Sequence, residues 1–144
     1  MNRQAFGILE FGSLRNLVRR STQTEVGAAR IDQLAPLADF EALQRELCAT
    51  REMIALRQRA AKLSFEGIAD PAESLARLQI EGRALEPLAI LDLARISERA
   101  MDARAAIATE REVCPTLFEI VSALPKDLAK LAALIHRKIL PSGE

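Results

Sequence analysis

Apolar residues recur every three or four positions in several separate stretches of this chain, the spacing that places them on one face of a helix. The first stretch runs from Ser13 to Arg20. The second follows Thr22-Gln23-Thr24-Glu25, which matches a capping box in which Thr22 and Glu25 satisfy free backbone N–H groups. It ends before Pro36. These stretches predict two short helices.

The third predicted helix is longer, and Asp39 is a good N-cap for it. We expect it to end near Ala61, ahead of a loop at residues 64–67. Its apolar stripe comprises Phe40, Leu43, Leu47 and Ile54, widened by Met53 and Leu56. This stripe predicts the face that the helix buries against its neighbours.

Proline and glycine punctuate the next part of the chain. Asp70-Pro71-Ala72-Glu73 predicts a helix that Asp70 caps, with Pro71 in its first position and Gly82 as its stop. Its apolar face is expected to be Leu75 and Leu78. Glu86-Pro87 opens a long helix by the same logic. The seam of that helix is Ala89, Leu93, Ile96, Ala100, Ala103 and Ile107. Its alanines favour a closely packed neighbouring helix. Because the seam covers fewer than three heptads, we expect that neighbour to lie within the chain rather than in a free-standing coiled coil.

Pro115 ends that segment, and a short helix is expected from about Thr116 to Ala123. The last helix carries one apolar face, made of Leu128, Leu131, Ile135 and Ile139. No hairpin signal interrupts these helices. The sequence therefore predicts an all-α fold, an irregular bundle of about six or seven helices in a single helical domain over residues 1–144.

Composition supports this fold class and bears on the partners and the location of the protein. The 144 residues include five Phe but no Trp or Tyr, which suits helices packed through leucine and alanine. Twenty basic and twenty acidic residues cancel, so the net charge argues neither for nor against a polyanionic partner. We see neither a signal peptide nor a membrane span, so we expect a cytoplasmic protein without a membrane partner. Cys48 and Cys114 are interpreted as small apolar residues.

Signals of catalysis are weak. No Gly-Lys-Ser/Thr phosphate loop is present, and Cys48, Cys114 and the single histidine, His136, lack the fourth ligand of a metal site. His136 is read as complementing the dipole at a helix C-terminus, and Glu98 and Asp102 as part of a solvated, salt-bridged face. We therefore predict no catalytic, cofactor-binding or metal-binding residue, and no enzyme activity in this chain.

Two basic clusters are candidates for contact with nucleic-acid phosphates. One comprises Arg57, Arg59 and Lys62, and the other comprises Arg15, Arg19 and Arg20. Each closes a predicted helix, where cations are also ordinary partners of the helix dipole. No aromatic side chain is interleaved for base stacking, so direct base reading is not expected.

The stretch from Thr24-Glu25-Val26-Gly27 through Pro36-Leu37-Ala38-Asp39 to Leu43 resembles the start of the core domain of the MutS ATPases. Leu9-Glu10-Phe11 resembles the opening of their second bacterial type. A later pattern of that type is matched by Asp70, Leu75, Arg77, Gly82, Leu85, Leu88 and Leu91. The resemblance runs from about residue 8 onward and identifies the core and lever region of such a protein.

This resemblance implies an N-terminal fragment of a larger, dimeric ATPase that acts on DNA or on ribosomes. Its other parts would be a clamp, an ATPase domain that uses ATP and Mg²⁺, and a C-terminal nuclease-like module. Such proteins are associated with DNA repair, suppression of recombination and handling of stalled ribosomes. No catalytic residue carries over onto this chain, so the implied role is mechanical: relaying ATPase-driven motion to the clamp. The alternative is an independent helical module for protein interaction or dimerisation, and a small helical enzyme or ligand-binding bundle is a third hypothesis.

Overall fold

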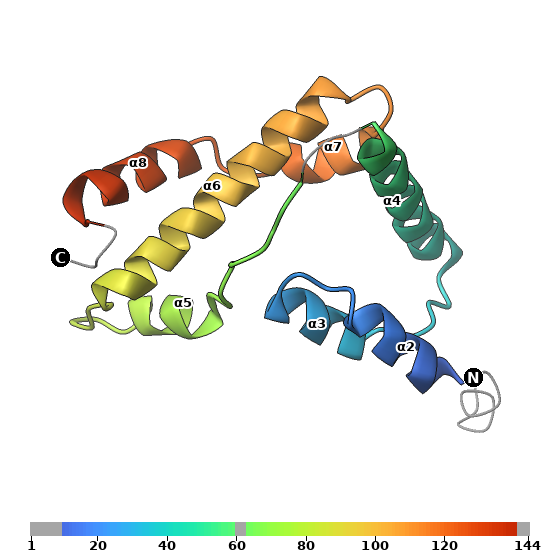
Figure 1. Ribbon diagram of the computed structural model, residues 1–144, viewed down its shortest axis with the longest axis horizontal. Coiled ribbons are helices and arrows are strands. Elements are labelled where there is room, and N and C mark those ends of the chain that lie inside the picture. The colour runs from blue at the N-terminus through green and yellow to red at the C-terminus, as the bar shows by residue number, and fades with distance from the viewer. Residues whose placement is uncertain (1–9, 60–62, 141–144) are drawn as a thin grey trace. The chain divides into compact units, whose positions relative to one another are not determined.

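The computed structural model describes residues 10–59 and 63–140, and all regular structure within them is helical (Figure 1). The helices are α2 (Phe11–Arg19), α3 (Glu25–Asp32), α4 (Phe40–Gln58), α5 (Ala72–Leu78), α6 (Pro87–Thr109), α7 (Pro115–Ser122) and α8 (Leu128–Lys138). No strand occurs in the described ranges. The all-α prediction, with about six or seven helices, is confirmed.

The chain divides into two compact units. The first unit comprises Met1–Pro36 and Phe65–Asp70, and the second comprises Leu37–Ser64 and Pro71–Glu144. The expected single domain over residues 1–144 stays a prediction. Within the described part of the chain, no helix is both long and apolar enough to cross a membrane.

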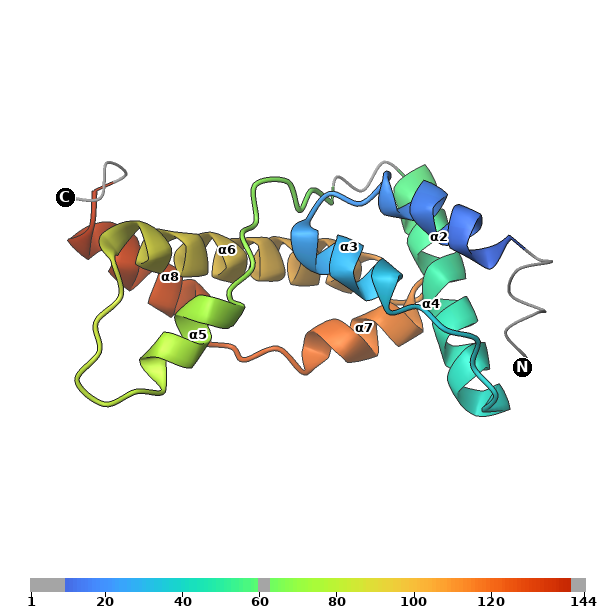
Figure 2. The same cartoon turned by 90° about the horizontal axis from the view of Figure 1, so that it is seen from below.

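In the first unit, α2 and α3 pack side by side (Figure 2). An ion pair joins them, because Arg19 Nε lies 3.0 Å from Asp32 Oδ2. The side chain of Gln23, between the two helices, accepts a hydrogen bond from the backbone N–H of Phe65 at 3.0 Å. This bond ties the segment after Ser64 back to the helix pair, although 42 positions separate the two residues.

The N-terminal cap of α3 differs from the predicted capping box. Thr24 is the N-cap, and its Oγ1 accepts from the Gly27 N–H at 3.0 Å. Thr22, the residue expected in this role, instead donates its hydroxyl to the Arg19 carbonyl at 2.7 Å. Thr22 therefore forms a hydrogen bond at the C-terminal end of α2, and Thr24 caps the N-terminus of α3. The predicted N-cap residue of α3 was wrong by two positions.

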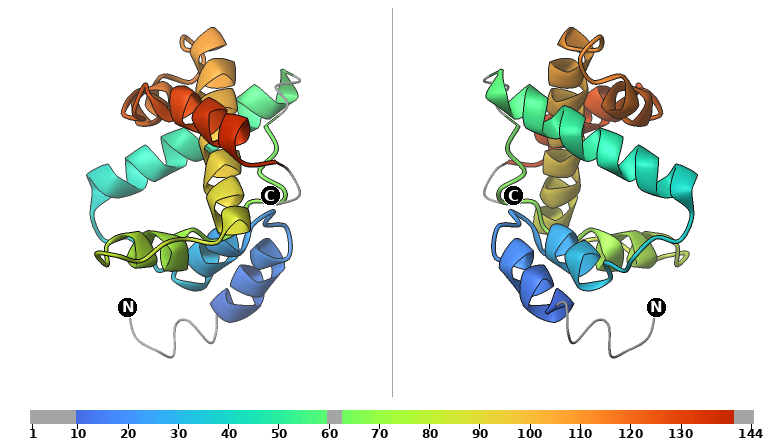
Figure 3. Two further views of the ribbon diagram at one scale, coloured as in Figure 1. Left: turned by 90° about the vertical axis from the view of Figure 1, so that its left-hand side faces the viewer. Right: turned by 90° about the vertical axis from the view of Figure 1, so that its right-hand side faces the viewer.

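In the second unit, α6 packs against α8 and α7, and α4 packs against α7 (Figures 1 and 3). Its hydrophobic core is a cluster of buried side chains: Leu56, Ile107, Cys114, Leu117 and Val121. Leu56 and Cys114 are fully buried. One short helix, α7, thus supplies much of the apolar surface that holds α4 and α6 together.

The predicted helix starts are mostly confirmed. Asp39 caps α4, its Oδ1 accepting from the N–H groups of Glu41 and Ala42 at 2.9 and 3.2 Å. Pro87 and Pro115 each occupy the first turn of their helices, where a missing N–H costs nothing. The exception is α5, which begins at Ala72 after Pro71 at the N-cap, one residue later than predicted.

The apolar face of α4 was assigned wrongly. The expected stripe is exposed at Phe40, Leu43, Leu47 and Ile54, whereas Leu56 is fully buried and Met53 packs against the core. The packed face is the one directed at α7, and it carries only part of the apolar sequence. In α5, likewise, Leu75 and Leu78 are about half exposed.

The seams of α6 and α8 are only partly as predicted. Ala103 and Ile107 are buried, but Leu91, Ala94 and Ser97 replace the earlier members of the predicted α6 seam, because α7 and α8 both contact this helix. On α8, Leu131 is 47 % exposed and its neighbour Ala132 is 2 % exposed. The small Ala132 side chain, which was not part of the predicted α8 face, lets α8 approach α6 closely.

We expect Ala132→Leu to lower the free energy of unfolding by about 1–3 kcal/mol, because added methylenes in a close helix contact force the helices apart. Ala133→Leu is the matched control, since Ala133 is exposed on the same helix. It should change stability by less than about 0.5 kcal/mol. Urea unfolding followed by far-UV circular dichroism measures both, and equal effects would show that α8 does not pack through Ala132.

Candidate functional site

In the second unit, the carboxylate of Glu52, on α4, makes two hydrogen bonds to another helix. Its Oε1 accepts from the Thr116 N–H at 3.1 Å and its Oε2 accepts from the Leu117 N–H at 2.9 Å. Both N–H groups belong to the first turn of α7. Glu52 is thus a helix cap supplied from another helix, 64 and 65 positions away in sequence.

The local sequence explains why α7 needs a cap from outside. Pro115 has no N–H, so Thr116 and Leu117 carry the first free donors of the helix. The N-cap residue, Cys114, forms no side-chain cap bond. Its thiol instead donates to the Glu110 carbonyl, with an Sγ–O distance of 3.0 Å. The Glu52 carboxylate satisfies the donors that Cys114 leaves open.

A cation holds the other end of α7. Arg104, on α6, donates from Nη1 to the Leu124 carbonyl at 3.2 Å, just beyond the last turn of α7. An anion at the N-terminus and a cation at the C-terminus both complement the helix dipole. Helix α7 is therefore fixed between α4 and α6 by two polar contacts as well as by its apolar face.

These contacts shift two pKa values. Burial raises the pKa of Glu52, but the hydrogen bonds from Leu117 and Thr116 outweigh it and leave the pKa of Glu52 below its ordinary value. Burial also raises the pKa of the Cys114 thiol, and the carboxylates of Glu52 and Glu110 raise it further against a smaller opposing effect of Arg59. At neutral pH the site holds a carboxylate and a protonated, unreactive thiol.

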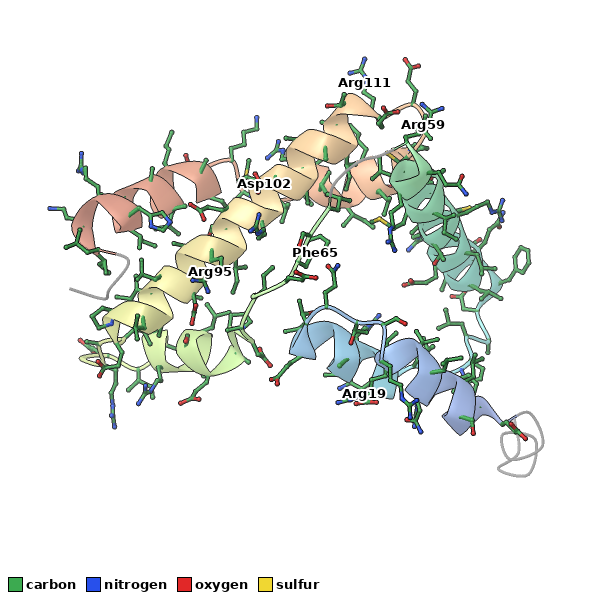
Figure 4. All side chains as sticks on the ribbon, in the orientation of Figure 1. Arg19, Arg59, Phe65, Arg95, Asp102 and Arg111 are labelled. Atoms are coloured by element: carbon green, nitrogen blue, oxygen red, sulfur yellow. The ribbon has the colours of Figure 1, made fainter. Side chains whose placement is uncertain are left out.

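The predicted basic clusters remain at their two helix ends, one in each unit. Arg57 and Arg59 lie at the C-terminus of α4, where Figure 4 labels Arg59. Arg59 pairs with Glu110 at 3.0 Å. Lys62 lies outside the described residues. In the other cluster, Arg19, which Figure 4 labels, pairs with Asp32. Arg20 is exposed, and the Arg15 Nε atom is buried without a hydrogen-bond partner among the described residues. Among the described members, Arg20 and Arg57 have no ion pair in the residues that the structure describes.

The remaining candidates form surface ion pairs. His136 Nε2 lies 2.9 Å from Glu98 Oε1, which links α8 to α6. On the face of α6 predicted to be salt-bridged, Arg95 pairs with Asp92 at 2.9 Å and Arg99 with Asp102 at 3.4 Å. In residues 10–59 and 63–140, no group of three or more His, Cys, Asp or Glu could hold a metal ion. Sequence analysis missed Glu52, although a proline-started helix preceded by a weak capping residue, Cys114, was a visible signal.

Comparison with known proteins gives relatives of one kind. Endonuclease MutS2 of Gemmatimonas aurantiaca is 33 % identical over 121 residues, which cover 84 % of this chain and 15 % of that protein. Endonuclease MutS2 of Thermomicrobium roseum is 31 % identical over 140 residues, 95 % of this chain and 17 % of that protein. The same-named protein of Exiguobacterium sibiricum is 27 % identical over 96 residues. No protein-family profile matches the chain, and no solved structure matches it.

The fold and the polar contacts define an all-α segment in which partly buried polar groups join one helix to another. The relatives extend this class to a particular family, and the predicted resemblance to the second bacterial type of MutS is confirmed. The chain belongs to the MutS2 family, and its alignments with the three relatives span 12–17 % of their length.

We expect Glu52→Gln to lower the free energy of unfolding by about 1–2 kcal/mol at pH 7, because a neutral amide replaces the ionised acceptor of two N–H groups. Glu119→Gln, at an exposed position of α7, is the control and should change stability by less than about 0.5 kcal/mol. Because the pKa of Glu52 is lower in the folded protein, its contribution is complete above the ordinary glutamate pKa of about 4.3.

That contribution is lost as the pH falls through the lowered pKa of the folded state. The stability difference between the wild-type protein and Glu52→Gln should therefore be constant from about pH 6 to pH 8 and shrink below about pH 4. Urea unfolding at a series of pH values measures it. A difference that grows on acidification would contradict the assigned role of the carboxylate.

Proposed function

We propose that this chain is a non-catalytic core and lever segment of a MutS2-type protein, and that it relays ATPase-driven motion toward the part of the parent that grips DNA. The parent would be a homodimeric ATPase. It would also have a nuclease activity, since the relatives are named endonucleases. ATP and Mg²⁺ would bind in domains other than this one. A parent that acts on the bacterial chromosome or on stalled ribosomes would be located in the cytoplasm.

The observation that carries the proposal is the Glu52 junction. A relay needs elements that move together, since a contact that yields absorbs displacement instead of passing it on. Both oxygens of Glu52 hold the N-terminus of α7, and Arg104 holds its other end from α6. A displacement of α4 is thereby coupled to α6, and through the α6–α8 contact to α8.

The test uses the full-length parent carrying Glu52→Gln, with Glu119→Gln as the control. The ATPase rate without DNA should stay within about twofold, because Glu52 touches no nucleotide. The coupling, measured as the ratio of ATPase rates with and without DNA, should fall by about 2- to 30-fold, the range for residues that modulate communication between sites. Unchanged coupling in a folded variant would sink the proposal, as would ATP hydrolysis by the purified 144-residue chain.

We also propose that Arg20 and Arg57 contact nucleic-acid phosphates, because both are exposed and have no ion pair within the described residues. Each phosphate contact contributes about 0.9 to the slope of the logarithm of the DNA-binding constant against the logarithm of salt concentration. Fluorescence anisotropy with a DNA duplex should therefore show a slope reduced by about 0.9 in Arg57→Gln. Arg83→Gln, between α5 and α6, should leave the slope unchanged. Equal slopes for Arg57→Gln and the wild-type protein would exclude the contact.

A second candidate function, an independent module for protein interaction or dimerisation, is favoured by one observation. The apolar residues along one face of α4 are exposed. A module that acts by association would present such a face.

A further inference from the structure

We draw no further inference here: the strongest candidate, the surface pocket that Cys48 and Glu52 of α4 line together with Val113 of the α6–α7 turn, carries nothing because it rests on a lone cysteine, and no second feature of the described residues points to a ligand there.

Discussion

The second unit depends on the capping of α7 by Glu52. A helix of eight residues has too few internal hydrogen bonds to be stable alone. Pro115 and Cys114 leave its first donors open, and the carboxylate of α4 closes them. Once α7 is formed, Leu117 and Val121 can join Leu56 and Ile107 in the core. The polar contact and the apolar cluster therefore support each other.

From α7 the order spreads through α6. This long helix meets α7 at its C-terminal half, where Ile107 lies in the core and Arg104 reaches the Leu124 carbonyl. Farther toward its N-terminus it meets α8, where Glu98 pairs with His136. The buried residues Ala94 and Ala132 have small side chains, so the helices can pack closely. The same small side chains bury little apolar surface. The unit is thus held by several small contacts in series.

Helix starts, which depend on neighbouring residues, could be predicted from the sequence. Contacts between residues far apart in the sequence could not. Asp39, Pro87 and Pro115 act on their own backbone neighbours, so a few residues of sequence suffice to place the helix starts. The buried face of α4 depends on where α7 lies, and its sequence is apolar on two sides. The Glu52 junction joins positions 64 and 65 residues apart, which no periodicity reveals. The MutS2 family could be predicted because its sequence pattern is spread along the chain. Errors in the predicted buried face of a single helix therefore did not affect that prediction.

The polar groups around α7 are engaged in contacts that hold the helix in place. Catalysis requires groups that are poised and incompletely satisfied, such as a thiolate or a raised carboxyl pKa. Around α7 the shifts run the other way: Glu52 is held ionised by two donors, and Cys114 is held protonated by burial and neighbouring carboxylates. Arg59 and Arg104 are likewise engaged, one with Glu110 and one with a helix end. Groups bound in this way resist both proton transfer and displacement, and this resistance supports the relay role proposed above.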